Sequence, residues 1–284
     1  MTLLEKQIHG LTADLSQVVS RLANEVTPKS VHRLRTTIRR IESVVSFANP
    51  DLGKKLERCL ERLEDLRRRA GKVRDIDVQV QLLSEIGNGS TARDRKALTD
   101  LLEKKRARHA RRLVTTLARQ ANAKFFARME RIAEKIAAGP SEYNRPLAPL
   151  EEARLQLSKL AEAFAEHESL KPNRLHEARI QLKKIRYLAE LADDSRERSA
   201  FLDGIRSVQT AVGDWHDWEE LAWLAEKRFA DRVNCHLLRE VRALFAARES
   251  EAVSAVTGLF ANAATAARKP PRAAQPLRTF ARHA

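Results

Sequence analysis

Two segments of the sequence carry histidine, arginine and lysine in the same register, 144 residues apart. The first segment is P-K-S-V-H-R-L-R-T-T-I-R-R-I, which begins at Pro28, and the second is P-N-R-L-H-E-A-R-I-Q-L-K-K-I, which begins at Pro172. Guanidinium groups bind phosphate oxygens through paired hydrogen bonds, and an ammonium group adds a compact positive charge. These residue types, repeated in this order, predict binding of a polyanion. The paired basic positions are His32 with His176, Arg35 with Arg179, Arg39 with Lys183, and Arg40 with Lys184.

Helical periodicity places these basic residues on one face of each segment and apolar residues on the other. The apolar positions are Val31, Leu34, Ile38 and Ile41 in the first segment and Leu175, Ala178, Leu182 and Ile185 in the second. Like charges four residues apart on a helix repel one another unless an anion neutralises them. Two such faces opposite each other would form a positively charged groove. An ordinary solvated surface is the alternative for each helix alone, and the duplication favours a binding site.

A third basic run, K-K-R-A-R-H-A-R-R, begins at Lys104. Its residues Arg108, Arg111 and Arg112 are expected to add a wall to the same site, and a solvated face is the competing interpretation. The pairs Arg74-Asp75 and His216-Asp217 each follow a glycine, so each aspartate is expected to cap the next helix. The three tryptophans are expected in the core: Trp215, Trp218 and Trp223.

The elements that position these residues are all expected to be helices, because apolar residues recur at intervals of three and four and glycine is scarce. Glycine and proline mark the expected breaks, including Gly71, Gly213 and the segment 139–149 with its three prolines. The helices are expected to begin near Thr2, Pro28, Asp51, Asp75, Thr91, Leu147, Pro172, Arg196, Asp217 and Val233.

The repeat predicts an all-α protein made of two related helical bundles with internal pseudo-twofold symmetry around a basic central cavity. Residues 1–267 are expected to form one domain, with half-repeats at about 1–145 and 146–267. Residues 268–284 contain three prolines and no acidic residue, and are expected to be a flexible basic tail.

The chain carries a formal net charge of +15, so its binding partner is expected to be an anion. Nucleic acid, a phosphate polymer and an acidic membrane surface all fit that charge. No secretory signal or membrane-spanning apolar run is present, so a cytoplasmic location is expected. Cys59 and Cys235 lack metal-ligand spacing and are expected to be buried; no metal, cofactor or catalytic residue is predicted.

The doubled motif resembles the CHAD family, the conserved histidine α-helical domains. The resemblance rests on V-H-x-L-R-x-x-x-R-R and L-H-x-x-R-x-x-x-K-K-x-R-Y, each followed by a G-x-x-R/H-D segment, and covers about residues 3 to 265. It implies a basic central cavity that binds inorganic polyphosphate, and in some members association with polyphosphate granules. The contacts it implies are His32, Arg35, Arg39, Arg40, His176, Arg179, Lys183, Lys184 and Arg186.

The sequence therefore predicts a stand-alone, non-catalytic polyphosphate-binding protein. Some family members carry an adjoining triphosphate-tunnel domain, which needs an E-x-E-x-K strand, but Glu249-Ser250-Glu251 lacks the lysine. A helical nucleic-acid-binding protein is the first alternative, with nucleic acid as a competing ligand. A polyphosphate-processing enzyme is the second, and it would need converging carboxylates to hold a divalent metal ion.

Overall fold

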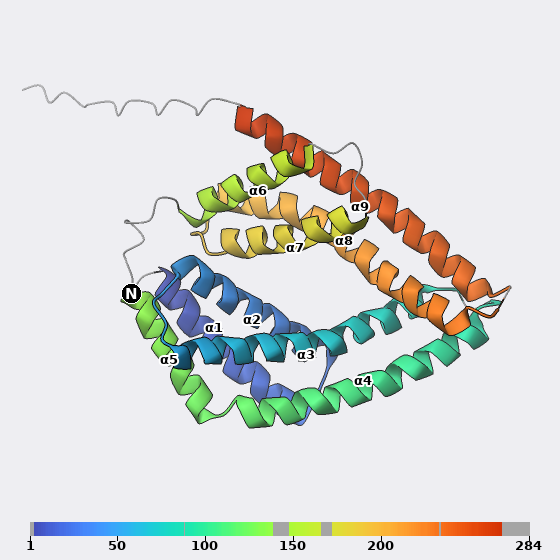
Figure 1. Ribbon diagram of the computed structural model, residues 1–284, viewed down its shortest axis with the longest axis horizontal. Coiled ribbons are helices and arrows are strands. Elements are labelled where there is room, and N and C mark those ends of the chain that lie inside the picture. Colours follow the sequence, from blue (N-terminus) through green and yellow to red (C-terminus); the bar gives the residue numbers. More distant parts are fainter. Residues whose placement is uncertain (1–2, 88, 139–147, 166–171, 233, 269–284) are drawn as a thin grey trace, which may run out of the picture.

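The computed structural model describes residues 3–87, 89–138, 148–165, 172–232 and 234–268, with side chains as far as residue 263. Within these ranges the protein forms nine α-helices and no strand, which confirms the predicted all-α class (Figure 1). The helices are α1 (Leu3–Asn24), α2 (Pro28–Ala48), α3 (Lys54–Glu85), α4 (Ala92–Gln120), α5 (Ala123–Ala137), α6 (Pro149–Ala165), α7 (Pro172–Ala189), α8 (Arg196–Phe229) and α9 (His236–Arg268).

The helices pack in the same order in each half of the chain. In the first half α2 contacts α1 and α3, and α4 runs along α3; in the second half α7 contacts α6 and α8, and α9 runs along α8. Helix α5 packs on α1 and α3. The halves meet where α2 packs on α7 and α3 packs on α8. The corresponding order agrees with a duplication, and the pseudo-twofold symmetry itself stays a prediction.

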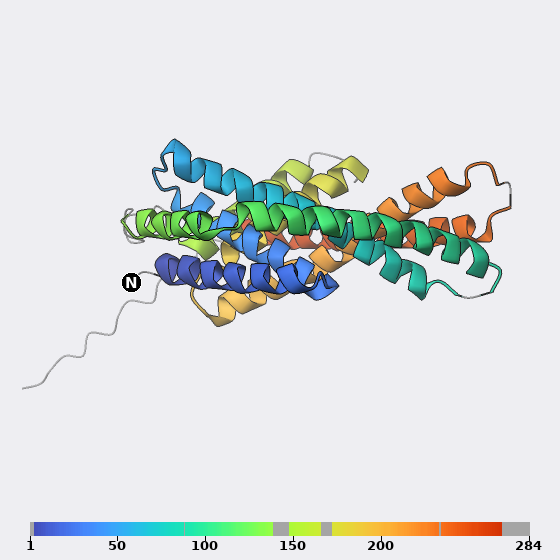
Figure 2. The same cartoon turned by 90° about the horizontal axis from the view of Figure 1, so that it is seen from below.

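Two buried apolar clusters hold this arrangement together. The larger cluster joins both halves and includes Ile38 of α2, Leu66 of α3 and Leu182 of α7, and the smaller one joins α3 and α4 to α8 and α9. The long hairpins α3–α4 and α8–α9 extend toward the same end of the molecule (Figures 1 and 2). None of the described helices combines the length and the apolar character needed to cross a bilayer.

Local chemistry explains where α2 begins and ends. The Thr27 hydroxyl accepts a hydrogen bond from the Ser30 amide at 3.1 Å, and the Ser30 hydroxyl accepts one from the Thr27 amide at 3.1 Å. Pro28 occupies the first turn, where a missing amide hydrogen costs nothing. Asn49 ends the helix in the left-handed conformation, at φ 42°. The basic face of α2 is therefore fixed in register from both ends.

Two predicted helix breaks are wrong. Helix α3 continues through Gly71 and Asp75, and α8 continues through Gly213 and Asp217, so neither aspartate caps a helix. A glycine inside a helix costs only about 1 kcal/mol, which the burial of flanking apolar side chains outweighs. A break that the sequence analysis missed separates α4 from α5, where the Asn122 side chain accepts a hydrogen bond from the Phe125 amide at 3.1 Å.

Most of the other structural expectations are confirmed. Cys59 and Cys235 are buried, as are Trp215 and Trp218. Trp223 is the exception, because 62% of its surface is exposed. The expected tail lies outside the described residues except for Arg268, which ends α9, and 139–147 of the expected divider also lie outside them.

Candidate anion-binding groove

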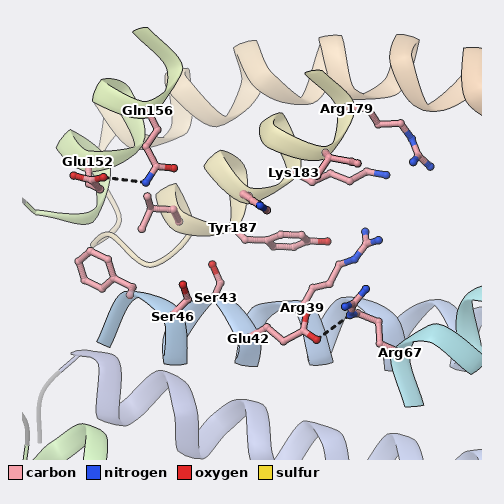
Figure 3. Close-up of a pocket in the computed structure, with 14 residues that line it drawn as sticks. Arg39, Glu42, Ser43, Ser46, Arg67, Glu152, Gln156, Arg179, Lys183 and Tyr187 are labelled. Atoms are coloured by element: carbon pink, nitrogen blue, oxygen red, sulfur yellow. Dashed lines mark hydrogen bonds and ion pairs between the residues drawn. The ribbon is translucent and has the colours of Figure 1, made fainter. Parts of the chain in front are cut away.

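A cavity of about 820 Å³ lies between α2 and α7, and parts of α3 and α6 complete its walls. The duplicated segments therefore face each other, as the repeat predicted. Figure 3 shows Arg39 extending from α2 and Arg179 and Lys183 extending from α7 into the same space. The residues lining this groove are Arg39, Glu42, Ser43, Ser46, Phe47, Arg67, Glu152, Gln156, Arg179, Ile180, Lys183, Lys184, Tyr187 and Leu188.

The cations at the centre of the groove have no carboxylate in direct contact among the described residues. No hydrogen bond or ion pair within the described part of the chain links Arg39, Arg179 or Lys183 to a carboxylate at contact distance. The Nε of Arg179 is buried and has no hydrogen-bond partner there either. Buried donors and charges are costly unless something satisfies them, so the groove is prepared for an anionic ligand.

Burial and the neighbouring cations both make the charged forms of Lys183 and Arg179 costly, as the pKa values of these groups indicate. Burial, then the charges of Arg179, Arg39 and Arg35, lower the pKa of Lys183 from 10.5 to about 7. Burial also lowers the pKa of Arg179, and the nearby charges of Arg39 and Arg35 act in the same direction. Each helix thus places its charges within electrostatic range of the other helix. An anion between them would relieve this repulsion.

Two aspartates beside the groove partly offset the positive charge. Asp75 of α3 accepts a hydrogen bond from Nη1 of Arg35 at 3.3 Å. Asp217 of α8 lies within electrostatic range of Arg179 and Lys183, although burial raises its pKa to about 6. Both aspartates lie in the segments that were expected to cap helices. Their position gives them a different role, as internal counterions that a bound anion would compete with.

The sequence analysis missed an ion pair inside the groove. Nε of Arg67 donates to Glu42 at 2.8 Å (Figure 3), and burial raises the pKa of Glu42 while Arg67 opposes that shift. Arg67 lies seven residues, or two turns, before Arg74, so both occupy one side of α3. That spacing could have identified Arg67 from the sequence.

A search of curated proteins gives no significant match, but two other comparisons do. The family model of the CHAD domain matches residues 3–226. The chain belongs to the CHAD family. The solved structure of the CHAD domain from the plant Ricinus communis is 16% identical, with a TM-score of 0.65, and the alignment covers 91% of this chain and 90% of that one. PptA from Streptomyces chartreusis is 17% identical, with a TM-score of 0.59 and coverage of 92% and 97%.

Of the other contacts that the CHAD resemblance implies, Lys184 lines the groove, and Arg35, Arg40 and Arg186 are not among its lining residues. Lys184 is exposed, whereas Arg40 donates to Glu190 at 3.0 Å across the junction of the two halves. Arg186 approaches the same carboxylate at 3.7 Å. Glu190, directly after α7, therefore links Arg40 in the middle of α2 to the end of α7, and Arg40 and Arg186 are partly neutralised before any ligand binds.

The two histidines of the CHAD motif do not line the groove. His32 keeps a large exposed surface at the start of α2 and does not line the cavity. Its partial burial, then the charges of Arg74, Arg35, Arg186 and Arg39, lower its pKa. The ring of His176 lies 5.4 Å from that of His216 of α8. Burial, then the charge of Arg179, lowers the pKa of His216 to about 3, so His216 is neutral at physiological pH.

The third basic run does not form a wall of the groove. Arg108, Arg111 and Arg112 are exposed on α4, and none of them lines the cavity between α2 and α7. Arg112 instead lines a separate cavity with residues of α3. Arg108 and Arg111 therefore fit the competing interpretation of a solvated face.

Proposed function

We propose that the groove between α2 and α7 binds inorganic polyphosphate without catalysing its conversion. The CHAD family is linked in general to polyphosphate binding. The observation that carries the proposal is the convergence of Arg39, Arg179 and Lys183 from two helices on one cavity, with no carboxylate in contact with them among the described residues.

The binding free energy would come from two sources. A phosphate chain exchanges its condensed counterions for protein cations, and the released ions make binding dependent on salt. Arginine adds paired hydrogen bonds to phosphate oxygens, and lysine adds a point charge. Charges on both walls let successive phosphates of one chain contact both halves of the domain.

A non-catalytic role fits the groups that are present. Among the described residues no cluster of three or more His, Cys, Asp or Glu side chains is arranged to hold a metal ion. Binding of long chains would also hold the protein on polyphosphate granules. We expect incubation with polyphosphate and Mg²⁺ to leave the chain length of the polymer unchanged.

The test reverses two central charges, with Arg39→Glu and Lys183→Glu in one protein. We expect this groove variant to lose binding of tripolyphosphate and to retain the helical circular-dichroism spectrum. The matched control is Lys54→Glu with Lys55→Glu, which changes the net charge equally at exposed positions at the start of α3. Retained tripolyphosphate binding in the folded groove variant would contradict the proposed function.

A further inference from the structure

A second concentration of basic side chains lies on the face of the domain formed by α3, α4 and α5. It surrounds two cavities, of about 370 Å³ and about 240 Å³. We call the cations around both cavities the outer face. The cations that line the first cavity are Arg62, Arg119, Lys124 and Arg128, and those that line the second are Arg68, Arg69, Lys72 and Arg112.

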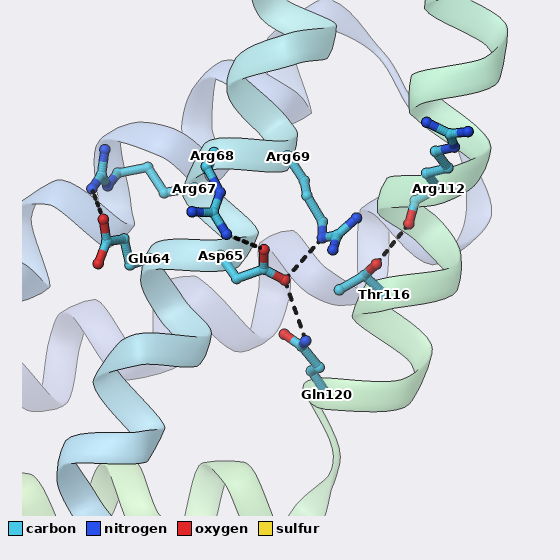
Figure 4. A network of polar contacts seen from close by, with 8 residues as sticks. All are labelled: Glu64, Asp65, Arg67, Arg68, Arg69, Arg112, Thr116 and Gln120. Carbon is cyan, nitrogen blue, oxygen red and sulfur yellow. Dashed lines mark hydrogen bonds and ion pairs between the residues drawn. The ribbon is translucent and has the colours of Figure 1, made fainter.

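A hydrogen bond connects the two cavities. Gln120 lines the first cavity, and its amide donates to the Asp65 carboxylate of the second at 3.4 Å. Asp65 also accepts hydrogen bonds from Arg68 at 2.9 Å and Arg69 at 2.8 Å (Figure 4). The two cavities of the outer face therefore lie next to each other.

Charge on the outer face is strongly unbalanced. Asp65 is the single carboxylate among the residues that line either cavity, against the eight arginines and lysines named above. His109 also lines the second cavity, where burial and the charges of Lys72, Arg112, Arg108 and Lys105 lower its pKa. Six of the eight cations have no ion pair with a described carboxylate, Arg68 and Arg69 being the exceptions. An anion could therefore bind without displacing an existing partner from them.

Helix α3 separates the outer face from the groove. The run of Arg67, Arg68 and Arg69 divides between the two sites, because consecutive residues on a helix point about 100° apart. Arg67 turns toward α2, whereas Arg68 and Arg69 lie on the side of Asp65 and α4 (Figure 4). A polyanion too long for the groove would meet more cations on the other side of the same helix.

We propose that the outer face is a second binding surface for long polyphosphate chains, distinct from the groove. The proposal rests on the proposed function for the choice of polymer, since polyphosphate is a series of closely spaced negative charges without bases. No phenylalanine, tyrosine or tryptophan side chain lines either cavity to stack a base, and Phe125 of α5 is buried.

Lysine footprinting of the unaltered protein tests the proposal directly. Acetylation would be followed by mass spectrometry at Lys72 and Lys124 of the outer face, Lys184 of the groove and Lys54 and Lys55 as reference sites, all of which are exposed. We expect chains of about 100 phosphates to slow acetylation of Lys72, Lys124 and Lys184 severalfold. Tripolyphosphate should protect Lys184 alone. Protection by long chains at Lys184 alone, or equally at Lys54 and Lys55, would overturn the proposal.

A pair of substitutions gives an independent measurement. In Lys72→Glu with Arg112→Glu, we expect affinity for long chains to fall about tenfold and the salt dependence to decrease by about two counterions. Affinity for tripolyphosphate should stay within about twofold, as for the Lys54→Glu, Lys55→Glu control. Equal loss for both ligands would overturn the second surface, since only a general charge effect would then remain.

The two proposals can fail separately. Tripolyphosphate binding to the groove variant tests the groove, and long-chain binding to the Lys72→Glu, Arg112→Glu variant tests the outer face. The footprinting is also carried out with single-stranded RNA of equal charge in place of polyphosphate. If RNA protects Lys72 and Lys124 as well as polyphosphate does, the outer face is a nucleic-acid surface and the assignment to polyphosphate is overturned.

Discussion

Lys183 is the residue whose chemistry is most altered by the groove. Burial makes its ammonium group costly to charge, and the nearby charges of Arg179, Arg39 and Arg35 add to that cost. Its pKa of about 7 means that the free protein holds this proton only weakly near neutral pH. A bound phosphate favours the charged form and raises that pKa. Binding and protonation of Lys183 are therefore coupled.

The coupling predicts a pH dependence with a definite sign. Above pH 7 the free protein must take up a proton at Lys183 to bind, so affinity for tripolyphosphate should fall as pH rises from 7 to 9. Asp217, with a pKa of about 6, is already charged across this range. Calorimetry in buffers of different ionisation enthalpy would measure the proton uptake. Lys183→Arg keeps the charge and should remove most of it; unchanged uptake in that variant would place the proton elsewhere.

On the proposed function, a polyphosphate chain that reaches Arg35 would compete with Asp75 for it, so removal of this carboxylate should strengthen binding. We expect Asp75→Asn to tighten polyphosphate binding by about threefold to tenfold, on the order of 1 kcal/mol. Asp203→Asn is the matched control, because Asp203 accepts a hydrogen bond from Arg206 at 3.0 Å at an exposed site outside the groove. Weaker binding by Asp75→Asn would show instead that Asp75 orients Arg35 for the ligand.

At the scale of the elements, α2 and α7 supply the central charges of the groove. Helix α3 packs against α2, and α8 packs against α7. The continuity of α3 matters because Gly71 lies against Arg35. A Cβ added at Gly71 would lie 4.0 Å from Cζ of Arg35, whereas one added at Gly213 would meet no atom within 4 Å. The two glycines of the repeated motif thus differ in their surroundings.

This difference predicts that a large side chain affects binding at Gly71 but not at Gly213. Gly71→Ala and Gly213→Ala should each raise the free energy of unfolding by about 0.5–1 kcal/mol, because alanine favours the helix. Gly71→Leu should displace Arg35 and weaken polyphosphate binding severalfold, and Gly213→Leu should leave binding unchanged. Equal effects of the two leucine variants on affinity would show that contact with Arg35 at Gly71 is unimportant.

Much of this arrangement could be predicted from the sequence, because it depends on local pattern. The apolar and basic faces of α2 and α7, the proline starts at Pro28 and Pro172, and the buried cysteines all follow from residue type and helical period. The duplication further predicted that the two faces would meet. The structure retains these features because burial of the apolar face and local capping favour the same helices.

The errors arose where distant packing decided the outcome. Gly71 and Gly213 resemble helix ends, but tertiary packing keeps α3 and α8 continuous. The break before Asn122 has no glycine or proline to mark it. The sequence predicts on which face of α4 Arg112 lies, but not which element that face contacts. In the structure α4 packs on α3 and contributes no residue to the groove.

At the scale of the whole molecule, the two halves enclose the groove between them. Contacts of α2 with α7 and α3 with α8 bring two sets of like charges together, and the shared apolar cluster stabilises this arrangement against their repulsion. The net charge of +15 attracts any polyanion, so charge alone does not select one. On the proposed function, selectivity would come from the confined groove, where a slender phosphate chain would reach cations on both walls.

Competition binding is the measurement that tests this central claim most directly. The purified protein would be titrated with labelled long-chain polyphosphate at physiological salt, against DNA and RNA of matched charge. We expect polyphosphate to bind at least about tenfold more tightly, a difference of about 1.4 kcal/mol, and the groove variant to lose that preference. Equal competition by the three polymers would contradict a selective groove and would make the protein a general polyanion binder.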